Sequence, residues 1–307
     1  MMDFVTFLQQ STNAVSLGAL YALFALGYSL VFSILGVLNL AHSAVFMWGA
    51  FFGLIALDQW HLPPWLAFIF ASCAAGLVSV SLEYVAFRPL RKRNAARIAQ
   101  LISSIGAALL LVNIAQLLYN QIYNASDAYY PRNIQLLPFI PSETVVVGSV
   151  SIAPIRLVIL VIALVMMLVL QYLVTSTRTG QQMRAVAFNQ RTAALLGINV
   201  NQIYVFTFLI AGMLAGAAGM LYGMAFLNVS PFVGGNVSLI GLTAIVLGGM
   251  GSIQGAVLGS FIVAGLQIAS TAAGGSSYRD AIVFFLLFVV LIIRPQGILG
   301  QPEQTRA

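Results

Sequence analysis

The chain has 307 residues, of which 61% are hydrophobic and only 7% are charged. A soluble globular protein of this length would carry roughly 75 charged residues, whereas this chain has 13 basic and 7 acidic ones. This composition excludes an ordinary soluble enzyme, a nucleic-acid-binding protein and a disordered protein. Because ~20 apolar residues cross a bilayer as a helix, the chain has room for roughly eight to ten membrane segments.

Apolar runs predict an all-α polytopic integral membrane bundle that forms a single transmembrane domain, residues 1–307, with about eight or nine transmembrane segments. The long segments are residues 13–35, 64–87, 98–119, 155–174, 203–226, 256–273 and 281–293. Two shorter apolar segments, residues 43–57 and 238–247, follow breaks in the pattern. Tyrosines in the polar stretch 120–153 and directly before it suit an interfacial belt, namely Tyr119, Tyr123, Tyr129 and Tyr130.

The basic residues lie at the ends of these apolar runs and account for the net charge of +6. Ten of the thirteen form three clusters: Arg88, Arg91, Lys92, Arg93 and Arg97; Arg178, Arg184 and Arg191; Arg294 and Arg306. Such clusters are typical of the cytoplasmic loops of membrane proteins, so we expect lipid around the chain and no nucleic-acid partner. If both short segments cross the membrane, there are about nine crossings and the N-terminus is outside; a re-entrant segment would change this count.

The two breaks, residues 36–42 and 228–236, fall at corresponding places in the two halves of the chain. In the predicted topology the halves have opposite orientations, which indicates an inverted repeat. The first repeat would be residues 1–119, the connecting span 155–174, and the second repeat 203–300. Paired, interrupted apolar segments point to a transport path. The alternative is that Gly, Pro and Asn breaks are simply common in polytopic proteins.

Residue types that carry chemistry are scarce. The single lysine, Lys92, is not part of a phosphate-binding loop, and His42 and His61 do not have metal-binding spacing. We therefore predict no catalytic residue, metal or cofactor, and expect any ATP to be hydrolysed by other subunits. Within the predicted spans only Glu83 is acidic. It lies near the end of its span, beside the basic cluster and within reach of Arg88, which indicates an interfacial ion pair.

Four segments of the chain resemble LivH-type permeases. They are residues 83–91 (EYVAFRPLR), 36–43 (GVLNLAHS), 244–256 (AIVLGGMGSIQGA) and 294–299 (RPQGIL). The resemblance extends from about residue 14 to residue 300. It departs at Ser43, where the family usually has Gly.

The resemblance implies a multi-pass permease subunit of a binding-protein-dependent ABC importer in the bacterial inner membrane. Its substrates would be branched-chain or other neutral amino acids. Its partners would be a second LivH/LivM-like permease, two ATP-binding cassette ATPase subunits and a periplasmic substrate-binding protein. Importers of urea and short-chain amides have similar permeases and remain an alternative. A stand-alone channel or a secondary transporter is an alternative of a different class, against which the scarcity of intramembrane charges argues.

Polar residues around the two breaks are the candidates for the substrate path. They are Asn39, His42 and Ser43 at the first break and Asn228, Ser230, Asn236 and Ser238 at the second. The N-termini of broken helices attract a carboxylate, so these residues would line the path of a zwitterion. Ser230, before Pro231, has the pattern of a helix N-cap. The alternative is that these side chains only cap helices and bond across them.

The hydrophilic loop 175–202 is the candidate coupling segment. Residues 179–197 predict one short helix with Gly197 in the C-terminal capping position, and four side chains at helical spacing share a face: Arg184, Phe188, Arg191 and Leu195. Residues 193–197 (AALLG) retain a trace of the Glu-Ala-Ala…Gly motif of importer loops. We expect this face to dock on an ATPase; the alternative is a helix lying on anionic lipid.

Overall fold

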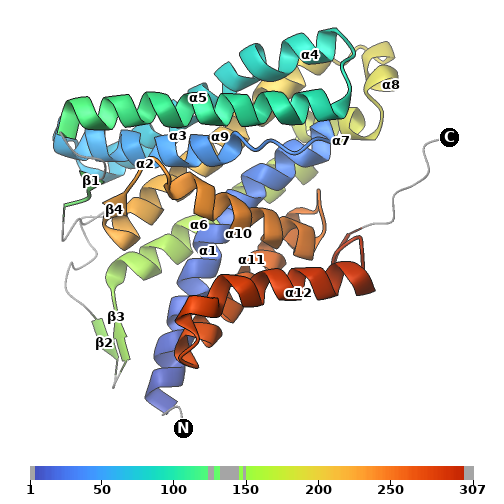
Figure 1. Ribbon diagram of the computed structural model, residues 1–307. Helices are drawn as coiled ribbons and strands as arrows, with labels where there is room; N and C mark the ends of the chain where they lie inside the picture. Colours follow the sequence, from blue (N-terminus) through green and yellow to red (C-terminus); the bar gives the residue numbers. More distant parts are fainter. Residues whose placement is uncertain (1–3, 124–127, 132–144, 148–149, 301–307) are drawn as a thin grey trace.

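The structure is a computed structural model that describes residues 4–123, 128–131, 145–147 and 150–300 (Figure 1). Seven helical segments of this part of the chain are long and apolar enough to cross a membrane, and two apolar helices, α2 and α10, are shorter. The helices are α1 (Phe4–Leu35), α2 (His42–Asp58), α3 (Pro64–Leu82), α4 (Arg88–Lys92), α5 (Arg97–Tyr123), α6 (Pro154–Ser176), α7 (Arg178–Phe188), α8 (Gln190–Leu195), α9 (Val200–Phe226), α10 (Val233–Gly248), α11 (Ile253–Ala272) and α12 (Arg279–Ile293). The predicted polytopic helical bundle is confirmed.

Short non-α elements join these helices. A π-helix, Glu83–Phe87, continues α3 into α4, and a 3₁₀ turn, Ser276–Tyr278, precedes α12. Strand β1 (Ala128–Tyr129) pairs antiparallel with β4 (Asn228–Val229), and β2 (Val145–Val147) pairs antiparallel with β3 (Val150–Ile152).

Two helix starts precede the predicted ones by five residues or more. Helix α1 begins at Phe4 instead of residue 13, and polar side chains of this added part bond within the helix: the Ser11 hydroxyl donates to the Phe7 carbonyl at 2.9 Å and the Thr12 hydroxyl to the Gln9 carbonyl at 2.8 Å. Helix α10 begins at Val233, five residues before the predicted segment.

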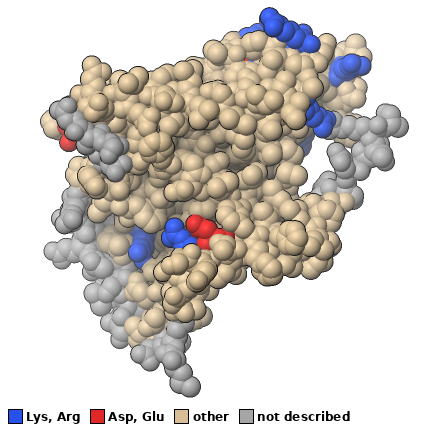
Figure 2. Space-filling model, in the orientation of Figure 1, with Lys and Arg blue, Asp and Glu red and all other residues tan. Residues whose placement is uncertain are grey.

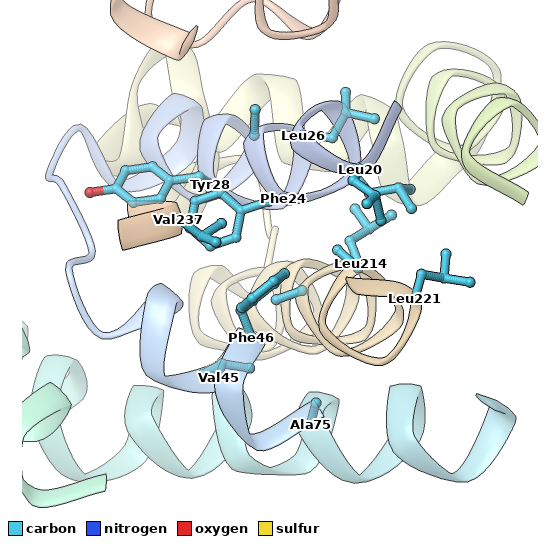
Figure 3. Close-up of a cluster of buried hydrophobic side chains, with 14 of the residues drawn as sticks. Leu20, Phe24, Leu26, Tyr28, Val45, Phe46, Ala75, Leu214, Leu221 and Val237 are labelled. Atoms are coloured by element: carbon cyan, nitrogen blue, oxygen red, sulfur yellow. The ribbon is translucent and has the colours of Figure 1, made fainter. Parts of the chain in front are cut away.

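The core lies where α1, α2 and α9 meet. Helix α1 packs on α9, α10 and α11, while α9 also packs on α2 and α3. Figure 3 shows side chains from these helices interdigitating, and the labelled residues are Leu20, Phe24, Leu26, Tyr28, Val45, Phe46, Ala75, Leu214, Leu221 and Val237. Helices α5, α6 and α12 bury little of their surface, as expected for helices that face lipid or another subunit.

Small residues allow the central helices to approach closely. A Cβ added to Gly219 would collide with the carbonyl oxygen of Phe46, and one added to Gly49 would collide with the backbone of Gly216. Gly212 lies equally close to Ser79 of α3. The glycines at steps of four in α9, Gly212 with Gly216 and Gly219 with Gly223, therefore serve helix packing.

The two largest basic clusters lie at one end of the bundle. Figure 2 shows Lys and Arg side chains gathered where Figure 1 places α4, α7 and α8. The Arg91 guanidinium donates to the Asn201 side chain at 3.0 Å, which joins α4 to the start of α9. We refer to this end of the bundle as the basic end. The two basic loops, which the sequence assigns to one side of the membrane, lie together there.

Candidate transport path and coupling surface

The N-terminal turns of the two short helices touch in the interior. The chain leaves α1 through Gly36, whose φ of +67° favours glycine, and re-enters a helix only at His42. A Cβ added to Gly234, in the first turn of α10, would collide with the carbonyl oxygen of Ser43 in α2. Helix N-termini carry unpaired N–H groups and a partial positive charge. Two such termini therefore lie side by side away from the ends of the bundle.

Asn39 lies buried in the first break, with 1% of its surface exposed. Its side-chain oxygen accepts from the Ala41 amide at 3.1 Å, which fixes the turn into α2. Its side-chain nitrogen has no hydrogen-bond partner among the residues that the structure describes. The next amide, that of Leu40, donates to the Ser104 hydroxyl of α5 at 3.2 Å. Asn39 thus combines a capping oxygen with an unused amide donor.

His42 is fully buried at the start of α2, beside two aromatic residues of α1. Its Nε2 lies 3.3 Å from the Phe24 carbonyl oxygen, and its ring lies 5.0 Å from the Phe24 ring and 5.5 Å from the Tyr28 ring. Within the described chain, His42 Nδ1 and the Tyr28 hydroxyl have no hydrogen-bond partner. The Ser43 hydroxyl, by contrast, donates to the Leu40 carbonyl at 2.9 Å. No sequence pattern indicates a role for Tyr28, which lies within an apolar run.

The second break is arranged differently from the prediction. Ser230 does not cap α10: its hydroxyl accepts from the Phe232 amide at 3.3 Å, forming a turn, and Phe232 holds the N-cap position. Asn236 and Ser238 lie inside α10 instead of in the break, and Asn236 is exposed. Asn228 is an exposed residue of β4. The structure therefore brings together the polar side chains of the first break but not those of the second. In the second half, α10 begins before the predicted segment, where Gly234 packs against Ser43.

Tyr130 links the strand pair β1–β4 to helix α2. Its hydroxyl donates to the Ala50 carbonyl of α2 at 2.6 Å, and its backbone amide donates to the Leu227 carbonyl at 3.2 Å. The ring occupies the space above Gly223, where an added Cβ would collide with it. Burial raises the pKa of Tyr130 well above its usual range. The predicted interfacial role is therefore wrong for this tyrosine, and also for Tyr119, which is fully buried.

Glu83 lies in the π-helix and is paired with Arg91, not with Arg88. The carboxylate accepts from the Arg91 guanidinium at 2.6 Å; the Glu83 side chain is fully buried and that of Arg91 is 18% exposed. The guanidinium also lies 3.9 Å from the centre of the Tyr204 ring in α9. The interfacial pair that the sequence indicated is therefore a buried clamp between the end of α3 and the start of α9. Single π-turns inside helices are frequent at functional sites.

The coupling segment is two helices and not one. Asn189 leaves the helical conformation, with φ −155° and ψ 108°, and its side chain accepts from the Arg191 and Thr192 amides at 3.0 and 3.1 Å. It thereby caps α8 and ends α7, so the predicted single face is wrong: Arg184 and Phe188 lie on α7, whereas Arg191 and Leu195 lie on α8. The predicted Gly197 cap is correct, with φ +85°.

Apolar side chains project from the coupling segment. Phe188 is 75% exposed and Leu195 is 89% exposed, and Leu196, which the sequence analysis did not single out, is 76% exposed. Large exposed apolar residues beside arginine are typical of protein interfaces. Arg184 lies apart from them: it donates to the Val174 carbonyl and lines a cavity of about 370 Å³ between the ends of α1 and α6, α7 and the start of α11.

In the described part of the chain, seven helices long enough to span a membrane accompany two shorter apolar helices whose N-terminal turns meet in the interior, an arrangement typical of membrane transport proteins. A family model described as the permease component of branched-chain amino acid transport systems matches residues 11–291. The chain belongs to this family, and the resemblance read from the sequence is confirmed. It is a multi-pass inner-membrane protein.

Several curated proteins are similar over almost the whole chain. The high-affinity branched-chain amino acid transport system permease protein LivH of Escherichia coli (strain K12) is 36% identical over 314 residues, 98% of each chain. The permease protein BraD of Pseudomonas aeruginosa, of the same description, is 35% identical over 311 residues, 99% of each chain. The ribose import permease protein RbsC of Escherichia coli (strain K12) is 30% identical over 128 residues, only 40% of each chain.

Proposed function

We propose that the chain forms, with a second LivH/LivM-like permease, the inward path of an ABC importer for branched-chain amino acids. Two ATP-binding cassette ATPase subunits would supply the energy, and a periplasmic binding protein would deliver the substrate. The observation that carries the proposal is the meeting of α2 and α10 beside buried polar groups of the first break. The full-length similarity to permeases named for branched-chain amino acids supports the substrate class.

The chemistry of the break suits an amino-acid zwitterion. The partial positive charges of two helix N-termini favour a carboxylate, and the unused Asn39 amide and Tyr28 hydroxyl are additional donors. Phe24 and Phe46, whose ring centres are 5.5 Å apart, provide an apolar wall for a branched side chain. A conformational change driven from the basic end would open this region, which is closed in the structure. The path would include Asn39 from the first break, His42 and Ser43 from the start of α2, and Asn228, Ser230, Asn236 and Ser238 from the second half.

The substrate and the energy source can be tested together. The chain would be reconstituted in proteoliposomes with its second permease, ATPases and binding protein, and uptake of radiolabelled leucine measured. We expect uptake to require ATP and to be reduced by valine and isoleucine but not by urea or acetamide. Preferential inhibition by urea or acetamide would indicate an amide importer, and uptake driven by an ion gradient without ATP would indicate a secondary transporter.

We also propose that the coupling segment transmits force from an ATPase. Truncation of a central aromatic anchor costs about 2 kcal/mol, roughly thirtyfold in affinity. Phe188→Ala combined with Arg191→Ala should therefore leave membrane levels normal but weaken co-purification of the ATPases and abolish most uptake. The matched control is Tyr278→Ala with Arg279→Ala, an exposed aromatic–arginine pair at the start of α12. Full ATPase yield with the first variant would favour a lipid-facing segment instead.

The proposed orientation puts the basic end in the cytoplasm and the N-terminus outside, with residues 1–119 and 203–300 as inverted repeats. An impermeant maleimide distinguishes the two sides in intact cells. In a Cys73→Ala background, a cysteine replacing the exposed Gln59, which follows α2, should react, and one replacing Arg93 should not. Labelling of the second position from outside would reverse the orientation.

A further inference from the structure

A second cavity at the basic end lies apart from the break and from the exposed coupling side chains. Its volume is about 750 Å³, and it is bounded by the π-helix and α4, by the start of α7 and by α9. Its lining includes Tyr84, Arg88, Gln182, Asn199, Phe206 and Leu209. The cavity thus joins the end of a membrane span to the coupling segment.

The polar part of the cavity has positive charge that no acidic group of the lining balances. Arg88 lies 4.8 Å above the Tyr84 ring, and its Nε is buried without a hydrogen-bond partner within the described part of the chain. None of the described residues that line the cavity is acidic. The nearby Glu83 carboxylate is paired with Arg91 at 2.6 Å. An anion is therefore the ligand that this part of the cavity favours.

The lining changes from polar to apolar along α9. Asn199, Asn201 and Gln202 lie at its start, while Phe206 and Leu209 lie further along it. With a rise of 1.5 Å per residue, Leu209 is about 10 Å deeper in the bundle than Gln202. On the adjacent π-helix Val85 is 76% exposed, as expected for a residue facing lipid chains. A small inorganic anion would leave the apolar half of this cavity unfilled.

We propose that this cavity binds an anionic phospholipid of the inner leaflet. The phosphate would lie at Arg88, and headgroup hydroxyls would bond to the amide side chains of Gln182 and Asn199. The first carbons of an acyl chain would follow Phe206 and Leu209. Basic pockets between membrane helices on the cytoplasmic side are suited to anionic headgroups. Because α4, α7 and α9 all contribute, the bound lipid would hold the coupling segment against the bundle.

The test measures binding and not transport, so its result is independent of the proposed substrate. The purified full chain, stripped of lipid in a neutral detergent, would be titrated with phosphatidylglycerol, phosphatidylcholine or inorganic phosphate while bound lipid is counted by native mass spectrometry and the melting temperature is recorded. We expect saturable binding and stabilisation by phosphatidylglycerol only. Arg88→Gln should weaken this binding about tenfold, the usual effect of losing one charge-assisted contact.

Two further variants make the outcome decisive. Arg97→Gln removes an exposed charge of the same cluster that does not line the cavity and should bind like the parent. Gln182→Trp fills the mouth of the cavity from an exposed position and should block binding even if Arg88→Gln fails to fold. Equal losses with Arg88→Gln and Arg97→Gln, or unchanged binding with Gln182→Trp, would show non-specific attraction to the basic end. Equal stabilisation by inorganic phosphate would show a free-anion site.

Discussion

The buried clamp between Glu83 and Arg91 allows a quantitative prediction. Replacing Arg91 by Met keeps a long apolar stem but leaves a fully buried carboxylate whose partner lay at 2.6 Å. Removal of one member of a buried ion pair costs about 3–5 kcal/mol. The change also removes the 3.0 Å hydrogen bond to Asn201 and the contact with the Tyr204 ring, each worth ~1 kcal/mol. Arg91→Met should therefore be strongly destabilising.

The reverse change should be milder. Glu83→Gln retains an oxygen that can accept from Arg91, and that guanidinium keeps its contacts with Asn201 and Tyr204. We expect a loss of about 1–2 kcal/mol. In the double variant the stranded charge is absent, so it should be more stable than Arg91→Met alone, with a coupling energy of at least ~1 kcal/mol. Stability would be measured by SDS titration and by thermal melting of the purified protein in one detergent.

A control and a contrary outcome define the test. Arg93→Met removes an exposed charge of the same cluster and should change stability by less than ~0.5 kcal/mol. If Arg91→Met matches this control, or if the losses of the two single variants simply add in the double variant, then the carboxylate is not held by Arg91. The clamp between α3 and α9 would then have no energetic basis.

Three further predictions follow from single contacts. Asn39→Ser keeps an oxygen that can cap the turn into α2 but lacks the amide donor. If the amide serves transport, uptake should fall as far with this variant as with Asn39→Ala. Recovery of uptake with Ser would indicate a capping role only. Gly219→Ala should lower stability by about 1–3 kcal/mol because its Cβ meets the backbone of α2, while Gly235→Ala, where an added Cβ has no described atom within 4 Å, should be neutral in thermal melting. Tyr130→Phe leaves the Ala50 carbonyl without its donor and should cost about 1 kcal/mol in the same assay, a loss that Tyr129→Phe, at an exposed position, should not reproduce.

The membrane segments could be predicted because each is a long apolar run bounded by polar or basic residues. The start of α10 was missed because it depends on a contact between distant parts of the chain. Residues 233–236 read Val-Gly-Gly-Asn, a poor helix-forming sequence, yet they form the first turn of α10 where Gly234 packs against Ser43. Nothing local to that sequence reports the neighbouring helix. The same limit applies to Tyr28, which only the fold brings beside His42.

The coupling segment and the ion pair were mispredicted for related reasons. Helical spacing was extended through Asn189, although Asn is a preferred N-cap and ends α7 by capping α8. Arg88 was chosen as the partner of Glu83 because it is nearer along the chain. Arg91 forms the pair because Asn201 and Tyr204, more than a hundred residues away, hold its guanidinium inward. Both errors arise where one local pattern fits two structures and tertiary contacts select between them.

The distribution of unpaired polar groups is the physical reason to place a solute at the first break. Several buried hydroxyls elsewhere in the bundle are satisfied by their own helices: Thr207 donates to the Ile203 carbonyl at 2.7 Å and Ser260 to the Ala256 carbonyl at 2.7 Å. The Ser79 hydroxyl is an exception, since it has no partner among the described residues. At the break, the Asn39 amide, His42 Nδ1 and the Tyr28 hydroxyl have no such partner in the described chain. Each unpaired buried group costs about 1–3 kcal/mol, and a chain this apolar could have avoided the cost with apolar side chains. What distinguishes the break is that three unpaired groups lie beside two helix N-termini, and this is the physical argument for the proposed path, in which a polar molecule satisfies them during transport.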